Sequence, residues 1–269
     1  MPFISDGRKL IRDAFERKYT LPAFNVCSVE MLRACLDAAE EEQAPIIIQT
    51  YPADLEQISQ KHLVALVKSY AEDLTVPVML HMDHGPSYEV AIACIRAGYS
   101  SVMYDGADAE LEEVLTTCKK LSEVAKITGV SLEVANDSFN KGKIAFSMPE
   151  EVTRLFEEGR ADMVAVSVGS EHGQSGELDL ELLSSIFKSV QSPLVMHGGS
   201  GITAEEHTYL RQNGVVKTNI GSALYRTLRS VWQRSEDANA HREVYARARA
   251  ALKEVAKDKI RMMDATGKA

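Results

Sequence analysis

Short apolar runs recur along most of this chain and alternate with stretches whose apolar residues lie three and four positions apart. We identify eight such runs: Pro22–Val26, Pro45–Thr50, Pro77–Asp83, Ser101–Asp105, Val130–Ala135, Met163–Gly169, Pro193–Gly199 and Val215–Gly221. This alternation is typical of strand–helix units around a parallel sheet. Because the runs are nearly continuous in Val, Ile, Leu and Met, the strands should be buried on both faces. Eight units close a (β/α)8 barrel, the TIM-barrel architecture, and this is the fold that we predict.

A doubly wound open sheet is the competing α/β architecture. Polar residues fall repeatedly at the C-terminal ends of the runs, where barrel enzymes place their chemistry, and this favours the barrel. The 269 residues also fit one barrel domain, which typically uses about 250 residues. We therefore expect a single domain over residues 1–269, with a helical extension from about residue 223 that packs on the barrel or on a neighbouring subunit.

The composition of the chain argues against some classes of binding partner. The net charge is −9 and the basic residues are dispersed among acidic ones, which argues against a nucleic-acid-binding surface. No apolar run approaches the roughly 20 residues that span a bilayer, so no membrane partner is expected. The first residues do not resemble a secretory signal, and we expect a cytoplasmic protein. The four cysteines lack Cys-x-x-Cys spacing and are interpreted as small buried hydrophobes.

Three histidines follow three different strand runs: His84, His172 and His197. In a barrel these strand ends converge on one mouth, so the three imidazoles should lie close together. Each histidine alone would be interpreted as a polar residue near the rim. Together they predict a catalytic metal site, since three imidazoles leave an open position on zinc for a substrate oxygen.

Small residues follow the same late strands and predict a phosphate-binding site. Glycine-rich turns beside helix N-termini let backbone amides approach an anion. The candidate residues are Gly173, Gly198, Ser200, Gly221 and Ser222.

Six segments in fixed order carry a family resemblance: Pro22-Ala23-Phe24-Asn25, His81-Met82-Asp83-His84-Gly85, Ser101-Val102-Met103-Tyr104-Asp105-Gly106, Val166 to Gly173, His197-Gly198-Gly199-Ser200-Gly201 and Val216-Lys217-Thr218-Asn219. In order and spacing they resemble the class II ketose-bisphosphate aldolases, of the fructose- and tagatose-bisphosphate types, over nearly the whole barrel. The resemblance implies reversible aldol cleavage of a ketose phosphate into dihydroxyacetone phosphate and an aldehyde. It also implies one Zn2+ per subunit on the three histidines. Another divalent metal could replace the zinc, and the resemblance also allows a monovalent cation. With the charged C-terminal helices it suggests a homodimer or homotetramer.

The resemblance also assigns roles to individual residues. Asp83 matches the acid/base that takes the hydroxyl proton in cleavage, with orientation of a histidine as the alternative role. Asn219 matches the residue that holds the hydroxyls of dihydroxyacetone phosphate, and Asn25 and Gln49 match pocket positions. Asp105 is expected to orient a metal histidine or a loop. Among the other histidines, His81 is assigned to the barrel interior or to a position that supports the residues of the site. We expect His62, His207 and His241 on the surface.

Two departures from the family concern the loop after the fifth strand and the residues near the distal half of the substrate. After the fifth strand Glu133 is kept, but Ala135 stands where the family has a second glutamate, and the following loop is short and basic. After the second strand, Tyr51 stands near the position where the bisphosphate enzymes place Ser or Thr for the distal phosphate. Because the loop is changed, the group that protonates the enediolate in the family has no evident counterpart. The two departures favour a non-standard aldehyde partner, for example one that lacks the second phosphate.

Two other functions remain open at this point. A metal-dependent isomerase or epimerase of sugar phosphates would use the same enediolate chemistry without an aldehyde site. A ligand-binding relative without turnover is the third, and the retention of Asp83 beside the histidines speaks against it.

Overall fold

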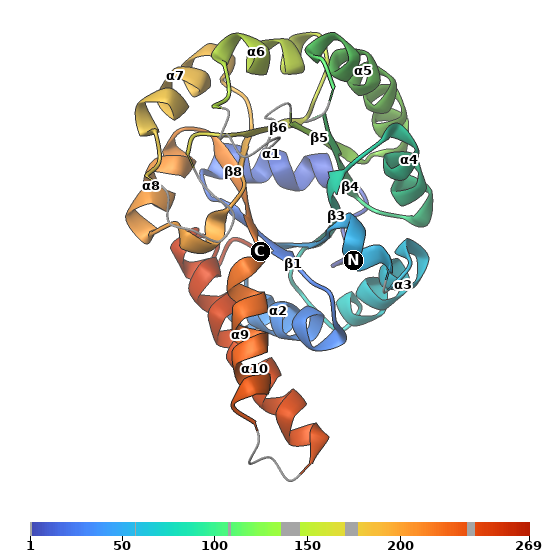
Figure 1. Cartoon of the computed structure of the whole chain (residues 1–269), viewed down its shortest axis with the longest axis vertical. Helices are drawn as coiled ribbons and strands as arrows, with labels where there is room; N and C mark the ends of the chain where they lie inside the picture. Colours follow the sequence, from blue (N-terminus) through green and yellow to red (C-terminus); the bar gives the residue numbers. More distant parts are fainter. Residues whose placement is uncertain (1, 57, 107–108, 136–145, 170–176, 236–239) are drawn as a thin grey trace.

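Eight parallel strands form a closed barrel in the computed structural model, which describes residues 2–56, 58–106, 109–135, 146–169, 177–235 and 240–269 (Figure 1). The strands are β1 (Leu21–Asn25), β2 (Ile46–Thr50), β3 (Val78–Gly85), β4 (Ser101–Asp105), β5 (Ser131–Ala135), β6 (Met163–Val166), β7 (Leu194–Met196) and β8 (Val215–Ile220). The barrel closes because β1 pairs with β8, with Leu21 beside Lys217 and Ala23 beside Asn219. The predicted barrel is confirmed, and the open sheet is excluded.

Helices surround this barrel and follow its strands: α2 (Val29–Glu42), α3 (Gln60–Ala71), α4 (Tyr88–Ala97), α5 (Leu111–Thr128), α6 (Pro149–Glu157), α7 (Leu180–Val190) and α8 (Ala204–Gln212). Several begin at a polar cap; Ser28 and Ser87 each accept a hydrogen bond from the backbone of the first turn, and Thr203 forms a capping box with Glu206. Two 3-10 turns, η1 (Pro52–Glu56) and η3 (Gly199–Gly201), follow β2 and β7.

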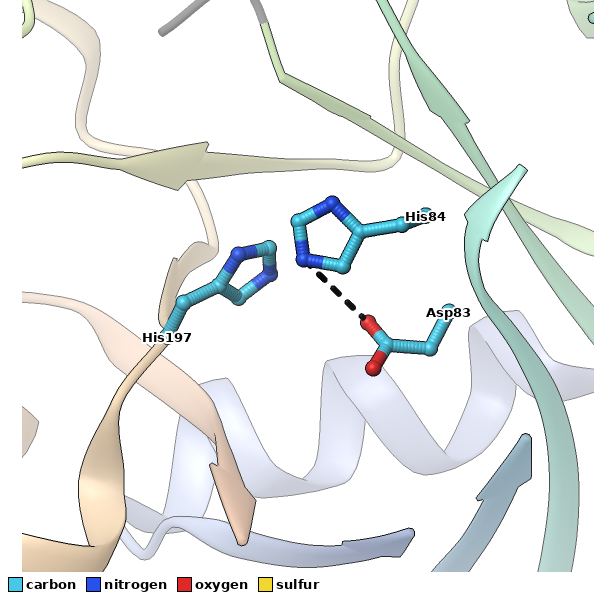
Figure 2. A group of neighbouring side chains, drawn as sticks. All are labelled: Asp83, His84 and His197. Atoms are coloured by element: carbon cyan, nitrogen blue, oxygen red, sulfur yellow. Dashed lines mark ion pairs between the residues drawn. The ribbon is translucent and has the colours of Figure 1, made fainter. Parts of the chain in front are cut away.

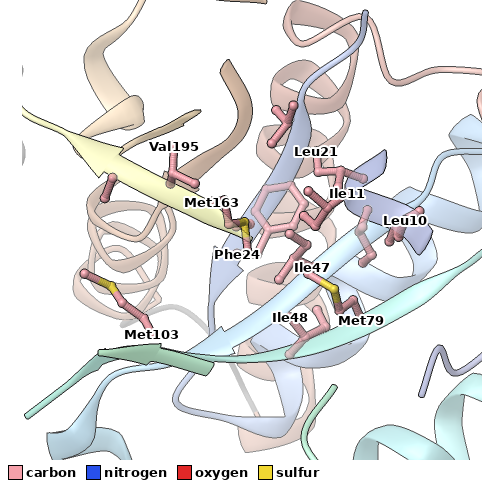
Figure 3. Packing of buried hydrophobic residues seen from close by; sticks show 14 of the residues in the cluster. Leu10, Ile11, Leu21, Phe24, Ile47, Ile48, Met79, Met103, Met163 and Val195 are labelled. Atoms are coloured by element: carbon pink, nitrogen blue, oxygen red, sulfur yellow. The ribbon is translucent and has the colours of Figure 1, made fainter. Parts of the chain in front are cut away.

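The first helix, α1 (Gly7–Arg17), lies across the N-terminal end of the barrel (Figure 1). It enters the barrel so closely that a Cβ at Gly7 would lie 2.4 Å from the carbonyl oxygen of Ser100. Its buried Leu10 and Ile11 join the apolar side chains of the strands, including Phe24, Ile47, Met79 and Met163 (Figure 3). The core is therefore sealed at this end, and the opposite end carries the polar side chains.

The charged C-terminal stretch is helical, with α9 (Ser222–Gln233) and α10 (His241–Met262) extending away from the barrel (Figure 1). Ion pairs join α10 to α2: Arg249 to Asp37, Lys253 to Glu41 at 2.5 Å, and Arg261 to Glu42 at 2.6 Å. The C-terminal end of α10 is thereby fixed against the barrel wall.

Cys35, Cys94 and Cys118 are buried and Cys27 is half-buried, all as free thiols. Among the residues that the structure describes, no helix combines the length and hydrophobicity needed to cross a membrane.

The surface assignment of His207 is wrong, because this residue of α8 is fully buried. Neither ring nitrogen has a hydrogen-bond partner among the described residues. Burial, and then the charges of Lys259 and Arg211, lower the pKa of His207 from 6.5 to about 3. His62 is exposed, as predicted, and its Nδ1 lies 3.0 Å from the hydroxyl of Ser59.

This burial predicts an acid-dependent loss of stability. Below pH 6.5 the unfolded chain takes up a proton at His207 that the folded protein excludes until about pH 3. Stability from this residue is therefore present above pH 6.5 and is lost as the pH falls, by up to about 1.4 kcal/mol per pH unit. Urea unfolding of wild type and His207→Leu between pH 7 and pH 5 measures it: the variant should lose less stability on acidification. His62→Leu is the control, and equal pH slopes for wild type and His207→Leu would contradict the prediction.

Candidate active site

A pocket of about 330 Å³ opens among the C-terminal ends of the strands. Its described lining residues are Asn25, Tyr51, Asp54, Asp83, His84, Gly198, Ser200, Asn219, Gly221, Ser222 and Tyr225. The structure thus brings together nine residues predicted from the sequence. Asp54 in η1 and Tyr225 in α9 were not predicted, although each lies within three residues of a residue that was. His172, Gly173 and the basic loop after β5 lie outside the described residues.

His84 ends β3 in a left-handed backbone conformation, with φ of 53°, which is unusual for a residue other than glycine. Its Nδ1 lies 2.6 Å from Oδ2 of Asp105, so the lone pair of a neutral ring is on Nε2. Burial lowers the pKa of His84, but the hydrogen bond to Asp105 and the charges of Asp83 and Asp105 outweigh it, and the pKa is raised. Asp105 lies where an orienting residue for His84 was predicted.

His197 follows β7 and faces His84, with ring centroids 4.7 Å apart (Figure 2). Its Nε2 lies 3.1 Å from Oε1 of the fully buried Glu133, so Nδ1 carries the lone pair of its neutral ring. Ligand atoms of Asp83, His84 and His197 all lie within 4.8 Å of one another. Imidazoles whose other nitrogen is held by a carboxylate are typical of metal sites, so this donor set fits a divalent metal.

Asp83 lies beside the histidines and accepts hydrogen bonds from three amides. Asn219 donates to Oδ1 at 2.9 Å, while Asn25 and Gln49 donate to Oδ2 at 2.7 and 3.2 Å. A carboxylate offers about four lone-pair sites, so the three amides fix its position and leave capacity for one further donor. A substrate hydroxyl is such a donor.

Lys217 belongs to one of the sequence motifs, but no role was predicted for it. In the structure its side chain contacts both Glu133 and Asn219. Its ammonium is fully buried, 2.9 Å from Oε2 of Glu133, and donates to Oδ1 of Asn219 at 2.6 Å. The second contact fixes which end of the Asn219 amide faces Asp83. The only sequence signal was its spacing of two residues from Asn219, which places both side chains on the same face of β8.

His81 lies in the same buried layer, inside the barrel and next to Glu133, which also holds His197. Its Nδ1 lies 2.7 Å from the hydroxyl of Ser101, and its Nε2 lies 3.4 Å from Oε2 of Glu133. Burial, and then the positive charge of Lys217, hold the pKa of His81 well below its ordinary value. The ring is therefore neutral at physiological pH.

Small residues that line the same pocket have the features of an anion site. Gly198 has φ of 73°, and a Cβ at Gly199 would lie 2.0 Å from Cγ2 of Thr218, so both positions require glycine. The hydroxyl oxygen of Ser200 accepts a hydrogen bond from the amide of Ala223 at 3.1 Å, which leaves the hydroxyl proton available to a ligand. The N-terminus of α9 begins at Ser222, where backbone amides favour a bound phosphate.

Tyr51, Asp54 and Tyr225 also line the pocket; we call them the distal wall. Tyr225 reaches the edge of the anion site, since a Cβ at Gly221 would lie 3.3 Å from its Cε2. The Tyr51 ring lies 5.4 Å from that of His84, and the amide of Tyr51 donates to Oδ2 of Asp54 at 3.0 Å. Burial, opposed by the Tyr51 amide and aided by the charge of Asp83, raises the pKa of Asp54. The described lining of the pocket includes no Lys or Arg.

Comparison with known proteins gives consistent results. A family model described as fructose-bisphosphate aldolase class-II matches residues 5–268. A fructose-bisphosphate aldolase of Staphylococcus aureus is 32% identical over 286 aligned residues, covering all of both chains. The crystal structure of the YdjI aldolase from Escherichia coli K12 superimposes with a TM-score of 0.90 at 28% identity, covering 98% of each chain. The fructose-bisphosphate aldolase of Campylobacter jejuni, at 22% identity and a TM-score of 0.82 over 99% of this chain and 97% of that one, shares the fold.

The contact between Asp105 and His84 predicts an effect on metal affinity. In Asp105→Asn the ring loses its carboxylate partner, so zinc binding to metal-free protein should weaken by about 10- to 100-fold. Competition with a chelating dye measures the affinity. Asp54→Asn, which removes a carboxylate of the same pocket without touching either ring, should change it less than about threefold. Equal affinities for Asp105→Asn and wild type would show that Asp105 does not support the metal.

Proposed function

We propose that this chain, which belongs to the class II fructose-bisphosphate aldolase family, reversibly cleaves a ketose phosphate into dihydroxyacetone phosphate and an aldehyde. Membership of the family makes it an aldolase, which is a carbon–carbon lyase. The observation that carries this proposal is the position of Asp83. Its carboxylate, fixed by three amides, lies beside the His84–His197 pair and lines the same pocket as the anion-site residues Gly198, Ser200, Gly221 and Ser222. A phosphorylated donor held at its phosphate would reach the acid/base and the metal ligands together.

The metal proposed for this site is zinc, held by His84 and His197 together with His172. When bound, it supplies a Lewis acid that polarises the ketose carbonyl and accommodates the negative charge that develops during cleavage. A histidine site accepts other divalent ions as well, with affinities in the Irving–Williams order. A monovalent cation beside the phosphate is also part of the family expectation.

Asp83 moves the proton. In cleavage its carboxylate accepts the proton of the substrate hydroxyl, the carbon that bears that oxygen becomes the aldehyde, and the electron pair of the broken carbon–carbon bond stays on the donor fragment. That fragment becomes dihydroxyacetone phosphate when its carbon takes up a proton from solvent, and Asp83 releases its own proton to solvent. In condensation Asp83 returns the proton to the new alkoxide. Asn219, whose amide Lys217 and Asp83 hold, is placed to bind the donor's hydroxyls.

The distal wall supports an acceptor aldehyde without a phosphate. Asp54 contributes negative charge, and the phenols of Tyr51 and Tyr225 offer hydrogen-bond donors and ring surfaces. Hydroxyl groups suit this wall better than a second phosphate. Ala135 stands where the family has a second glutamate, and its buried methyl group can neither donate nor accept a proton, so it takes no part in moving protons during the reaction.

Solvent exchange and condensation test the reaction. Zinc-loaded protein in D2O should exchange the donor-carbon proton of dihydroxyacetone phosphate and should condense it with unphosphorylated aldehydes from a panel. Asp83→Asn keeps a side chain of the same shape without the base and should lower condensation by about 10²- to 10⁴-fold. Absence of both exchange and condensation in wild type would overturn the proposal, and ketose interconversion without cleavage would replace it with an isomerase.

The carboxylate of Asp54 predicts the direction of a specificity change. Removing one negative charge from the distal wall should improve kcat/KM for glyceraldehyde 3-phosphate by roughly fivefold, which corresponds to about 1 kcal/mol. The value for unphosphorylated glyceraldehyde should change by less than about twofold, since no charge is involved. Steady-state kinetics of Asp54→Asn with both aldehydes measure the ratio. A ratio equal to that of wild type would show that Asp54 does not discriminate against the second phosphate.

A further inference from the structure

Lys259 lies in α10, far along the chain from the pocket, yet its side chain ends at the phosphate loop. We define this loop as Gly198–Gly201. The residue is buried, and its ammonium donates to the carbonyl oxygen of Ser200 at 3.1 Å and lies 3.5 Å from that of Gly199. Neither partner is a carboxylate. A buried ammonium is costly unless it is compensated, so the position requires an explanation beyond packing.

The two carbonyls determine where the loop amides point. In a trans peptide the C=O and N–H groups point in opposite directions, and the structure contains no cis peptide among its described residues. Because the carbonyls of Gly199 and Ser200 face Lys259, the N–H groups of Ser200 and Gly201 face away from α10. The described lining of the pocket includes Gly198 and Ser200 and no residue of α10. The pocket is therefore on the side of the loop away from Lys259, which is the side that these amides face and that a bound phosphate requires.

The loop is also held on its other sides. Thr218 of β8 leaves no space for a side chain at Gly199, and the amide of Ala223 in α9 donates to the hydroxyl oxygen of Ser200. Lys259 adds the third attachment and the only charged one of the three. A loop fixed from three elements keeps its amides in place before the ligand arrives.

Lys259 has one positive and one negative neighbour. Burial, and then the charge of Arg226 in α9, lower the pKa of Lys259, while the charge of Asp258 in α10 opposes this. His207 of α8 is neutral because burial and the charge of Lys259 lower its pKa. A phosphate dianion at the loop would add a negative charge on the other side of the two carbonyls that Lys259 contacts.

We propose that Lys259 is a positioning residue for the substrate phosphate, holding the carbonyls of the phosphate loop so that the loop amides face the phosphate and placing a positive charge behind them. Lys259 itself does not contact the substrate. The inference rests on the proposed phosphorylated donor and extends the function of the C-terminal helix from packing to substrate recognition.

Binding of inorganic phosphate and the choice between two donors test this role. Lys259→Met should weaken binding of inorganic phosphate to the zinc-loaded full-length protein by about tenfold or more, since a hydrogen-bonded charge is lost. It should raise KM for dihydroxyacetone phosphate in the exchange assay by a similar factor. Exchange of unphosphorylated dihydroxyacetone should stay within about twofold of wild type, because this donor does not use the loop.

Two variants provide the comparison. Lys259→Arg keeps the charge and should restore phosphate binding to within about threefold of wild type. Lys257→Met, on the same helix but paired with Glu41 at 2.8 Å, should behave as wild type. If Lys259→Met does not fold, Lys259→Gln provides the test: its amide can still donate to a carbonyl but carries no charge, so it should lose part of the phosphate binding that Lys259→Arg retains.

The outcomes separate this inference from the proposed function. Equal losses with both donors, or unchanged phosphate binding in Lys259→Met and Lys259→Gln, would overturn the positioning role. If wild type binds phosphate, Lys259→Met weakens that binding, and no exchange of dihydroxyacetone phosphate occurs, the inference stands and the proposed reaction fails.

Discussion

The buried ion pair between Lys217 and Glu133 is the interaction on which the rest of the site depends. Glu133 uses its second oxygen to hold His197, and Lys217 uses its ammonium to hold the amide of Asn219, which in turn donates to Asp83. One pair of charges thus sets the orientation of a proposed metal ligand and of the residue that positions the acid/base. Because both charges are fully buried, removing either would leave the other uncompensated at a cost of about 3–5 kcal/mol.

Around this pair the pocket divides into parts with different degrees of resemblance to the family. The histidines, Asp83 and the phosphate loop retain the family pattern, and in the proposed reaction they act on the donor. Tyr51 and Ala135 depart from that pattern, and in the proposed reaction the distal wall faces the acceptor. A change confined to the acceptor half alters specificity and leaves the donor chemistry in place, because that chemistry is independent of which aldehyde is formed.

Much of this arrangement could be predicted from the sequence, for physical reasons. Continuous β-branched runs identify parallel strands, and the polar residues at their C-terminal ends converge whatever the details of packing. This is why Asp83, His84 and Asn219 line one pocket and His197 lies beside His84. Strand ends were less predictable: β7 ends at Met196, because Gly198 takes a left-handed conformation and Gly199 begins a 3-10 turn.

Contacts between distant elements were not predictable. The ammonium of Lys259 reaches Ser200 from 59 residues away, and nothing in its charged helical surroundings distinguishes it from exposed neighbours such as Glu254. His207 was misplaced for the same reason, since the polar pattern of α8 hides the residue that faces the barrel. Asp54 and Tyr225 line the pocket because of the directions that η1 and α9 take, and tertiary packing determines those directions.

In the proposed complex a metal held by His84 and His197 and a phosphate held by Gly198, Ser200, Gly221 and Ser222 occupy one pocket, with Asp83 beside the metal ligands. A crystal structure with zinc and dihydroxyacetone phosphate, using anomalous scattering at the zinc edge, would show whether this is so. We expect one zinc peak within bonding distance of Nε2 of His84 and Nδ1 of His197, with the donor's phosphate at the loop amides and its hydroxyls facing Asn219. Zinc bound elsewhere, or a phosphate at the distal wall, would contradict it.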